Sequence, residues 1–438
     1  MQITVVGAGH AGLVTAAGLA RFGHDVICVE IDAARVAALR AGNAPFFEPD
    51  LDALIAEGTH SGRLVFVHAS DAAHAYAIAD LVFVIVDTPR RGDGSVELSQ
   101  VEAAMAAAAS HLGDGVVLVV KSTVPVGTTR EVGERLAERR PDLRFAMAAN
   151  PEFLRQGTAV ADFLHPDRII VGVDEPAAGE TVKRAHQPLV DREIPVLVTA
   201  IESAELIKYG SNAFLATKLS FINEIADLCE ASGAAVDEVA AGLGLDRRIG
   251  PAFLRPGPGF GGACLPKDTH ALLHTSRSYG TGSRIVGAAL RVNEERVHRM
   301  VDKILGAAGE AQAGRRVAVL GITFKADTDD IRESPAVEIV AALDAAGATV
   351  TVYDPKGMAA ARRVLPAAVQ FAPDAYTAVA GAEVTVIATE WPEFRDLDLI
   401  RVRDGMAVPV IVDLRNLLAA DAAAAAGIRY LPIGRRVD

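Results

Sequence analysis

Residues 2–12, Gln-Ile-Thr-Val-Val-Gly-Ala-Gly-His-Ala-Gly, place a short β-prone run directly before a glycine-rich turn. The turn has the pattern G-x-G-x-x-G, and a helix-prone stretch follows it. In this pattern Gly7 permits the tight turn, Gly9 lets a pyrophosphate approach the backbone, and Gly12 allows close packing of the helix. The stretch therefore predicts the start of a dinucleotide-binding Rossmann domain, with phosphates at the positive end of the helix.

The second candidate strand, residues 25–30, ends at Glu30, 18 residues after Gly12. A carboxylate at this place binds the ribose hydroxyls of adenosine and repels the additional phosphate of NADP, so NAD is the predicted cofactor. Asp32 is the alternative for this role, because it lies only two residues further on. Arg35 either stacks on or pairs with the adenosine end, or is an ordinary solvated arginine.

Composition limits the remaining possibilities. The chain has 438 residues, enough for two or three domains, with 43 basic and 56 acidic residues and a net charge of −13. This balance argues against a nucleic-acid-binding surface. The apolar runs are too short to cross a membrane, and the three cysteines are too few for a disulfide framework. We therefore expect a cytoplasmic protein whose thiols are free. We predict no metal site.

The order of apolar runs predicts an α/β protein with two Rossmann-like domains. Continuous hydrophobicity in the runs indicates strands buried on both faces, as in parallel sheets. A long Pro-free stretch from Ile201 to about Ser232 has helical spacing and predicts a long central helix. We expect an NAD-binding domain over residues 1–200, a helical dimerisation domain over 201–300, and a second Rossmann-like domain over 301–438. The predicted strands are 2–6, 25–30, 81–86, 116–121 and 168–173 in the first domain, and 317–320, 349–353, 384–388 and 410–413 in the last.

A Gly- and Pro-rich segment, residues 250–266, interrupts the helical region and is predicted to be a functional loop. It contains Cys264, with Lys267 and Asp268 within four residues. A nearby cation favours the nucleophilic thiolate, so Cys264 is a candidate nucleophile. Cys28 and Cys229 lie in an apolar strand and helix, and we expect them to be core residues.

Several further motifs occur in a fixed order along the whole chain. With them the chain resembles the UDP-glucose/GDP-mannose dehydrogenase family. The residues that carry the resemblance are Gly7–Gly12, Thr88-Pro89, Lys121-Ser122-Thr123-Val124-Pro125-Val126-Gly127-Thr128, Asn150-Pro151-Glu152-Phe153-Leu154, Glu205-Leu206-Ile207-Lys208, Asn212, Phe260–Asp268, Gly321-Ile322-Thr323-Phe324-Lys325 and Arg332-Glu333-Ser334.

The resemblance implies a four-electron oxidation of a nucleotide sugar, with UDP-glucose as the expected substrate and UDP-glucuronate, a polysaccharide precursor, as the product. Cys264 would attack the intermediate aldehyde to give a thiohemiacetal and then a thioester. By motif position, Lys208 and Asn212 would stabilise the oxyanion, and their spacing of four places them on one helix face. Glu152 would act as general acid/base, and Asp268 and Thr123 would order water and assist proton transfer.

The resemblance also implies binding roles. Thr88, Thr123 and Lys267 would contact the cofactor. The substrate would be bound by Glu152, Phe153, Leu154, Lys208, Asn212, Phe253, Leu254, Arg255, Gly257, Gly259, Phe260, Lys325 and Arg415. Arg248 would reach the site of the neighbouring subunit in a homodimer built on the long helix.

Two positions depart from the family pattern. Gln156 stands where many members have a second glutamate, so Glu152 and Asp268 should carry the proton transfers. Ala263 stands where serine is common before the nucleophile.

Other functions remain open at this point. GDP-mannose is an alternative sugar, because Leu254-Arg255-Pro256-Gly257 is similar to that subgroup. A 6-phosphogluconate-type hydroxyacid dehydrogenase needs no cysteine and usually has a single Rossmann domain. A nucleotide-sugar epimerase is expected to have Tyr-x-x-x-Lys, which this sequence lacks. An NAD-responsive regulator has no need of a reactive thiol.

Overall fold

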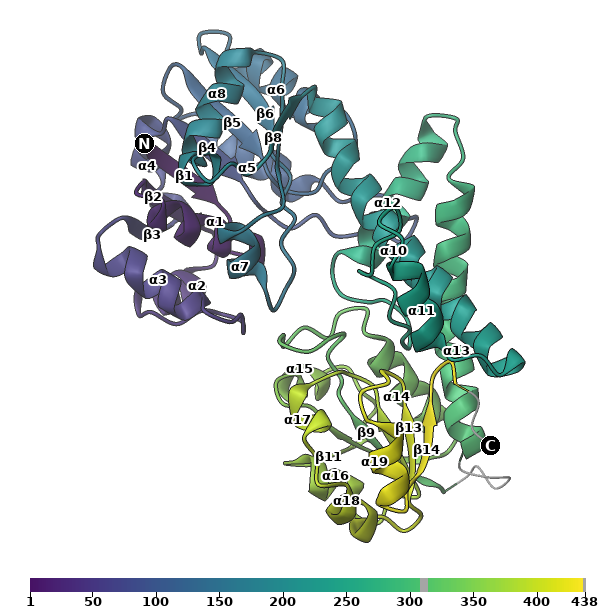
Figure 1. The fold of residues 1–438 in the computed structure, drawn as a ribbon. Coiled ribbons are helices and arrows are strands. Elements are labelled where there is room, and N and C mark those ends of the chain that lie inside the picture. The colour runs from purple at the N-terminus through teal and green to yellow at the C-terminus, as the bar shows by residue number, and fades with distance from the viewer. Residues whose placement is uncertain (308–313, 436–438) are drawn as a thin grey trace. The chain divides into compact units, whose positions relative to one another are not determined.

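The computed structural model describes residues 1–307 and 314–435. The chain divides into two compact units, each described here by itself (Figure 1). The first unit comprises residues 1–211 and 270–281, and the second comprises 212–269 and the chain from 282 onward.

The first unit is built on an eight-stranded sheet with the order β3-β2-β1-β4-β5-β6-β7-β8. All neighbouring strands are parallel except β6 and β7, which are antiparallel. The central strands β4 and β5 are buried on both faces, as their continuous apolar sequence predicts. The strands are β1 (Gln2–Val6), β2 (Asp25–Glu30), β3 (Leu64–His68), β4 (Leu81–Val84), β5 (Val116–Val120), β6 (Phe145–Ala149), β7 (Ile169–Val173) and β8 (Val196–Thr199).

Helices cover both faces of this sheet with separate hydrophobic cores. One core contains Leu13 of α1 and Phe163 of α7, and the other contains Met105 of α5 and Leu136 of α6. The helices are α1 (His10–Arg21), α2 (Ala33–Arg40), α3 (Leu51–His60), the 3-10 turn η1 (Ala69–Asp71), α4 (Ala73–Ile78), α5 (Ser99–Ala109), α6 (Thr128–Arg139), α7 (Ala159–Leu164), α8 (Pro176–Ala185) and α9 (Gln187–Val190).

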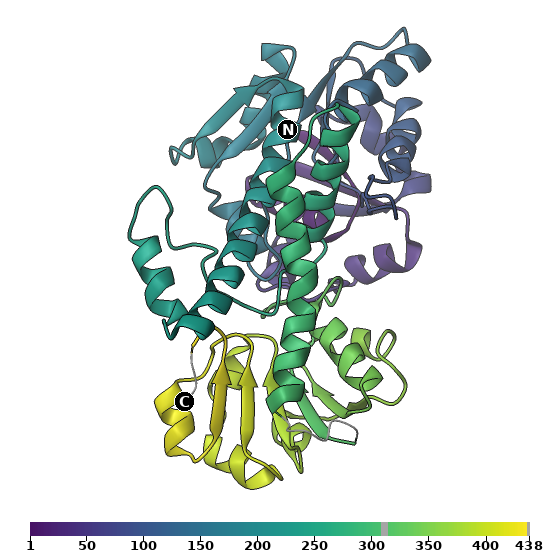
Figure 2. The ribbon, with the colours of Figure 1, turned by 90° about the vertical axis from the view of Figure 1, so that its right-hand side faces the viewer.

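The long central helix is confirmed as α10 (Ile201–Ser232), a single continuous helix of 32 residues. The helices that follow it are α11 (Val236–Gly244), α12 (Leu265–Ser278) and α13 (Arg284–Ala307). Figure 2 shows α13 as the long green helix whose C-terminal part lies against the second sheet. Ile304 of α13 and Ile339 of α14 (Pro335–Ala345) lie in the core on this face.

The second sheet has six parallel strands in the order β11-β10-β9-β12-β13-β14, the same winding as the first six strands of the other sheet. Its strands are β9 (Arg316–Leu320), β10 (Thr349–Tyr353), β11 (Gln370–Phe371), β12 (Val384–Ile387), β13 (Val410–Asp413) and β14 (Arg429–Pro432). The remaining helices are α15 (Met358–Ala361), α16 (Ala375–Val379), α17 (Pro392–Arg395), α18 (Leu399–Gly405) and α19 (Ala420–Ala425).

The predicted fold class is confirmed, since both sheets have the Rossmann strand order and a long helix lies between them in the sequence. The division into three domains at residues 200 and 300 stays a prediction. Within the described residues, no helix has the length and apolar character needed to span a membrane.

Candidate active site

The glycine-rich turn of the first unit has the shape that a phosphate-binding loop needs. Gly7 has φ +105°, and a Cβ there would lie 2.2 Å from the carbonyl oxygen of Ile85. At Gly12 a Cβ would lie 2.1 Å from the carbonyl oxygen of Gly7. A Cβ on Gly9 would meet no atom closer than 4.0 Å, the distance to Asp87 Oδ1. Packing therefore requires glycine at positions 7 and 12, whereas Gly9 leaves space for a pyrophosphate.

Glu30 ends β2 beside this turn and is buried. Its Oε2 accepts a hydrogen bond from the Ala8 amide at 3.0 Å, and Arg35 Nη1 lies 3.4 Å from the same oxygen. Asp32 instead caps α2 by accepting from the amides of Ala34 and Arg35. The structure thus favours Glu30 over Asp32 as the ribose-binding carboxylate, because Glu30 alone contacts the turn.

A second acidic residue at the turn was missed by the sequence analysis. Glu48 is buried and its Oε2 lies 2.6 Å from Nε2 of His10, inside the glycine-rich motif. Its two oxygens also accept from the amides of Gly157 (2.7 Å) and Ala159 (2.8 Å). Glu48 therefore ties the phosphate-binding turn to the segment that follows Glu152.

Lys208 and Glu152 form a largely buried ion pair in the first unit, with Nζ 3.1 Å from Oε1. Glu152 Oε2 also accepts from the Leu154 amide at 2.6 Å. Burial opposes ionisation of Glu152, but Lys208, the Leu154 amide and Lys121 together hold its pKa below the ordinary value. Glu152 is therefore a carboxylate placed to accept a proton.

The predicted residues Thr123 and Phe153 lie in the same unit. Thr88 donates a hydrogen bond from its hydroxyl to the carbonyl oxygen of Thr123 at 2.9 Å, which joins two of the predicted cofactor residues. Lys208 Nζ lies 5.3 Å from the centre of the Phe153 ring, and Arg168 stacks on that ring at 3.9 Å. Arg168 was not predicted to contribute to this cluster.

In the second unit, Cys264 is exposed and directly precedes α12. Its carbonyl oxygen accepts from the Asp268 amide at 2.8 Å, as the residue before a helix does. The predicted loop over residues 250–266 is therefore too long by two residues, because Leu265 and Pro266 already belong to α12. The N-terminus of a helix favours an anionic sulfur, which adds a second reason for the thiolate.

Three predicted residues surround this helix start. Lys267 Nζ lies 2.6 Å from Asp268 Oδ1, and Asn212 Nδ2 donates to Asp268 Oδ2 at 2.6 Å. Asp268 is almost fully buried. Its carboxylate thus fixes the orientations of both the predicted oxyanion ligand and the lysine that follows the nucleophile.

Polar side chains of α10 and α13 hold the backbone of the loop before Cys264, and the sequence analysis missed them. Gly257 donates from its amide to Asn223 Oδ1 at 2.9 Å and accepts at its carbonyl from Arg296 Nε at 2.9 Å. Asn293 binds both the amide (2.7 Å) and the carbonyl (3.0 Å) of Phe260. We call Asn223, Asn293 and Arg296 the loop clamp.

The same loop packs tightly against the segments that follow β9 and β13 of the second sheet. A Cβ on Gly261 would lie 2.1 Å from the Glu333 carbonyl oxygen, and a Cβ on Gly257 would lie 3.2 Å from Arg415 Nη1. Arg415 donates to the carbonyls of Ala388 and Phe324, both at 2.9 Å. The structure therefore brings Gly257 and Arg415 together, beside the segment that carries Lys325.

Among the described residues, four of the six non-glycine residues with positive φ lie in the second unit near this loop, and the other two, Asp50 and Glu193, lie in the first unit. Phe253 (φ 62°), Asp327 (φ 61°), Glu333 (φ 49°) and Asn416 (φ 49°) all have left-handed backbone conformations. Phe253 is itself a predicted substrate residue, and the others lie next to predicted ones or contact the loop. Left-handed conformations at non-glycine residues are costly and gather at functional sites, which agrees with this position for the site.

Arg248 and Arg255 are exposed, and the side chain of Arg248 pairs with Asp246 at 2.6 Å. Within the part of the chain that the structure describes, neither arginine has a hydrogen bond or ion pair with the residue clusters above. The catalytic and binding roles of all the predicted site residues stay predictions, including those of Leu254, Gly259 and Lys325.

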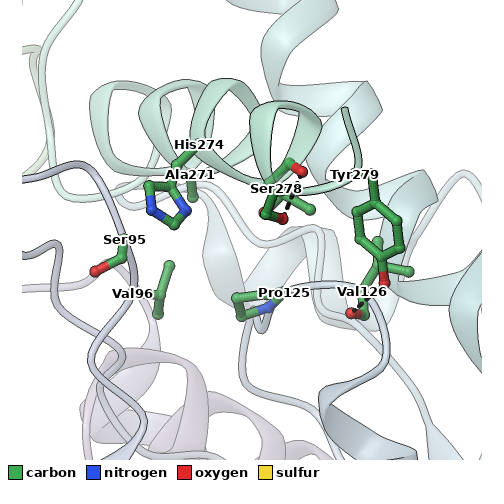
Figure 3. A pocket seen from close by; sticks show the side chains of 9 residues that line it. Ser95, Val96, Pro125, Val126, Ala271, His274, Ser278 and Tyr279 are labelled. Carbon is green, nitrogen blue, oxygen red and sulfur yellow. Dashed lines mark hydrogen bonds between the residues drawn. The ribbon is translucent and has the colours of Figure 1, made fainter. Parts of the chain in front are cut away.

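A cavity of about 270 Å³ in the first unit lies apart from the predicted residues. In Figure 3, His274, Ala271 and Ser278 of α12 face Val96 and Pro125 across it. Tyr279 closes one end and donates from its hydroxyl to the Val126 carbonyl at 3.4 Å. Its lining contains none of the predicted site residues.

Comparison with known proteins matches all three parts of the chain. Residues 1–190 match the NAD binding domain of the UDP-glucose/GDP-mannose dehydrogenase family, residues 202–295 its central domain, and residues 318–420 its UDP binding domain. The match over residues 1–190 confirms NAD as the predicted cofactor.

Full-length relatives agree with these matches. A UDP-glucose 6-dehydrogenase of Rhizobium meliloti (strain 1021) is 49% identical and covers 99% of this chain and 100% of its own. One of Bacillus subtilis (strain 168) is 40% identical, with coverage of 100% and 98%. The structure of a UDP-glucose dehydrogenase from the archaeon Pyrobaculum islandicum has a TM-score of 0.89 at 38% identity, with coverage of 98% and 96%. The chain therefore belongs to the UDP-glucose/GDP-mannose dehydrogenase family.

Proposed function

We propose that the protein oxidises the C6 alcohol of UDP-glucose to a carboxylate, using NAD twice and Cys264 as a covalent nucleophile. The observation that carries the mechanism is the exposed thiol of Cys264 at the start of α12, next to the buried carboxylate of Asp268. The choice of UDP-glucose is supported by the relatives of that name.

The glycine-rich turn and Glu30 fit NAD. Gly9 leaves room for the pyrophosphate, and Glu30 lies at the strand end where the adenosine ribose would bind. When bound, NAD supplies a hydride acceptor, and a second molecule serves the second oxidation. Residues of the chain carry out the nucleophilic attack, the stabilisation of charge and the proton transfers.

The first oxidation removes a hydride from C6 and the hydroxyl proton, and leaves an aldehyde. An aldehyde presents no hydride that can be removed until a nucleophile makes its carbon tetrahedral. The Cys264 sulfur adds to that carbon to form a thiohemiacetal, and loss of the second hydride gives a thioester. Water then attacks the thioester, the carbon–sulfur bond breaks, and the acid and the free thiolate result.

We assign the polar groups by their charge and partners. Lys208 and Asn212, one turn apart on α10, stabilise the oxygen on C6 while it carries negative charge. Glu152, held ionised beside Lys208, takes up protons, and Asp268 with Thr123 orders the hydrolytic water. The amide of Gln156 does not ionise, so Gln156 cannot act as an acid or base and serves only in binding.

A panel of nucleotide sugars tests the substrate assignment. The purified protein is incubated with NAD and, in separate reactions, UDP-glucose, GDP-mannose, UDP-N-acetylhexosamines and 6-phosphogluconate, and NADH formation and acid product are measured. We expect the largest kcat/KM with UDP-glucose. Preference for GDP-mannose or 6-phosphogluconate would contradict the assignment, and NAD binding without turnover of any compound would indicate a regulator.

We further propose a homodimer built on α10. Phe214, Phe221 and Leu228 recur every seven residues on this helix and are 66%, 46% and 62% exposed. Apolar side chains at this spacing form a stripe along one face, which is the pattern of a helix that packs on a second copy. Arg248, exposed in the single chain, would then serve the neighbouring site.

Light scattering after size-exclusion chromatography tests the dimer. Phe221→Glu should shift the wild-type dimer towards monomer, because it places a charge in an apolar interface. Ile400→Glu, at an apolar residue of α18 that is 56% exposed, is the matched control and should remain dimeric. A monomeric wild type, or a dimeric Phe221→Glu variant, would contradict this assembly.

Location and pathway are also proposals. None of the three cysteines, all of which lie within the described residues, forms a disulfide, and this suits a reducing cytoplasm. The predicted product, UDP-glucuronate, suits supply of an acidic sugar for polysaccharide synthesis.

A further inference from the structure

Lys121 is a buried lysine to which the proposed mechanism assigns no role. It directly follows β5, and its side chain is only 5% exposed. Its Nζ donates to Asn150 Oδ1 at 2.9 Å and to the Asn150 carbonyl oxygen at 3.3 Å. Both acceptors are uncharged, and among residues 1–307 and 314–435 no carboxylate lies within salt-bridge distance of this buried ammonium. Burying a charge without an ionic partner costs free energy of folding, and such a cost is expected where the charge serves a function.

Asn150 links Lys121 to Glu152, the proposed general base. Asn150 directly follows β6 and is almost fully buried, and its Nδ2 donates to the Ile170 carbonyl on β7 at 2.7 Å. Glu152 lies two residues later and pairs with Lys208 at 3.1 Å. Lys121 therefore anchors the start of the turn whose third residue is the proposed general base.

Two charged groups act on Lys121, namely Glu152 on the turn after β6 and Lys208 on α10. A third titratable group, His186 between α8 and α9, is itself affected by the charge of Lys121. Burial lowers the pKa of Lys121 to about 8, with Lys208 acting in the same direction and Glu152 against it. Lys121 in turn helps to lower the pKa of Glu152. Because burial keeps the pKa of His186 low, at about 4, His186 is neutral where the enzyme works.

We propose that Lys121 is a positioning residue for the oxidation: it holds Asn150, and through it the turn that carries Glu152, and its ammonium is a second cation acting on the Glu152–Lys208 pair. This proposal rests on the proposed function. Loss of the Lys121 charge makes Glu152 easier to protonate, so it changes the pH range of catalysis as well as the rate. A purely structural lysine would not change that range.

The test compares kcat/KM for UDP-glucose across pH in the wild type, Lys121→Met and Lys121→Gln, each as the full chain. Lys121→Met removes the charge with little change in volume, and Lys121→Gln keeps a hydrogen-bonding side chain. The matched control is Lys183→Met, since Lys183 is a lysine of α8 whose side chain is 35% exposed and pairs with Glu180 at 3.8 Å, away from Glu152 and Lys208 in the sequence. Thermal stabilisation by NAD verifies that each variant has a folded first unit.

We expect both Lys121 variants to lose about tenfold or more in kcat. Their low-pH inflection should move to higher pH by about half a unit or more, because an opposite charge near a carboxylate lowers its pKa. The Lys183→Met profile should superimpose on that of the wild type. The wild type should also show an inflection near pH 8, which both Lys121 variants should lack.

The outcomes separate the two proposals. If the wild type oxidises no nucleotide sugar, the proposed function itself is wrong. If the wild type is active and a folded Lys121 variant keeps the wild-type inflections, Lys121 is only structural and the present proposal is overturned. If neither variant folds, the pH profile of the wild type tests the proposal. An inflection of kcat/KM near pH 8 would support it, and the absence of that inflection would overturn it.

Discussion

At the scale of single residues, Cys264 differs from the other two thiols in its surroundings. Cys28 and Cys229 are buried in the cores of the two units, and burial raises the pKa of both. Cys264 is exposed and lies at the N-terminus of α12. Exposure and helix position together make Cys264 the thiol that is available to react with an aldehyde.

We predict that Cys264→Ser forms no UDP-glucuronate from UDP-glucose while it retains NAD binding. The serine hydroxyl is a much weaker nucleophile towards the aldehyde, so the second oxidation cannot proceed. Product analysis and NAD-induced thermal stabilisation measure the two effects. Cys229→Ala, which alters a core thiol, is the control and should still form the acid. Acid formation by Cys264→Ser at the wild-type rate would show that another group is the nucleophile.

The buried imidazole of His186 should make stability depend on pH. Burial, with a contribution from the charge of Lys121, lowers its pKa from 6.5 to about 4. Between these values the unfolded chain binds more protons than the folded one, so stability is lost as pH falls from about 6.5 towards 4. The full effect is about 3 kcal/mol in the free energy of unfolding.

Thermal unfolding measured between about pH 7 and about pH 5 checks this prediction. His186→Leu should be less sensitive to acid than the wild type over this range. Equal sensitivity in the two proteins would show that other groups cause the acid dependence.

At the scale of elements, the loop clamp explains how a glycine-rich loop can hold a nucleophile in place. Asn223 on α10 and Asn293 and Arg296 on α13 bind the backbone at Gly257 and Phe260. Two helices thereby fix a segment that has few side chains of its own to pack. Such preorganisation keeps reacting groups within the narrow range of positions that catalysis requires.

We predict that Asn293→Ala weakens binding of the nucleotide sugar more than binding of NAD. The substitution removes two hydrogen bonds to Phe260, each worth about 1 kcal/mol. The KM for UDP-glucose should therefore rise about tenfold or more. Calorimetric titration with UDP and with NAD separates the two affinities. Asn43→Ala, at an exposed turn of the first unit, is the control. Equal loss of both affinities would mean general destabilisation and not a local effect on the loop.

The elements differ in how well the sequence predicts them. The bounds of α10 follow from 32 residues of helical periodicity, and those of β1, β2, β10 and β13 from short runs rich in β-branched residues, which in β10 (Thr-Val-Thr-Val-Tyr) alternate polar and apolar. The predicted strands do not include β3, β11 and β14. They also omit β6, whose residues Phe-Ala-Met-Ala-Ala suit a helix equally well, and β8, which is only half-buried. The start of α12 was missed because glycines and prolines obscure its first turn.

The residues of the candidate site also differ in how well the sequence predicts them. The motifs identify Cys264, Glu152 and Lys208, because each lies in a recognisable local pattern. The clamp residues lie 33 to 39 positions away from the loop that they hold, in helices where polar residues are common. Only the fold reveals which helical side chains face the loop, so no local pattern could have predicted them.

At the scale of the whole molecule, one chain carries an NAD binding domain, a central domain with the thiol and a UDP binding domain. A simple alcohol dehydrogenase needs neither a nucleophilic thiol nor a second Rossmann-like domain. Both are explained if the enzyme holds a nucleotide sugar through two successive oxidations. The central claim is therefore that the reaction transfers four electrons.

Counting NADH against UDP-glucose consumed tests this claim most directly. The reaction is run to completion with excess NAD, NADH is measured by absorbance, and the remaining sugar and any aldehyde are measured by chromatography. We predict two NADH per UDP-glucose, with UDP-glucuronate as the product and no aldehyde released. One NADH per sugar with accumulation of the aldehyde would contradict the account.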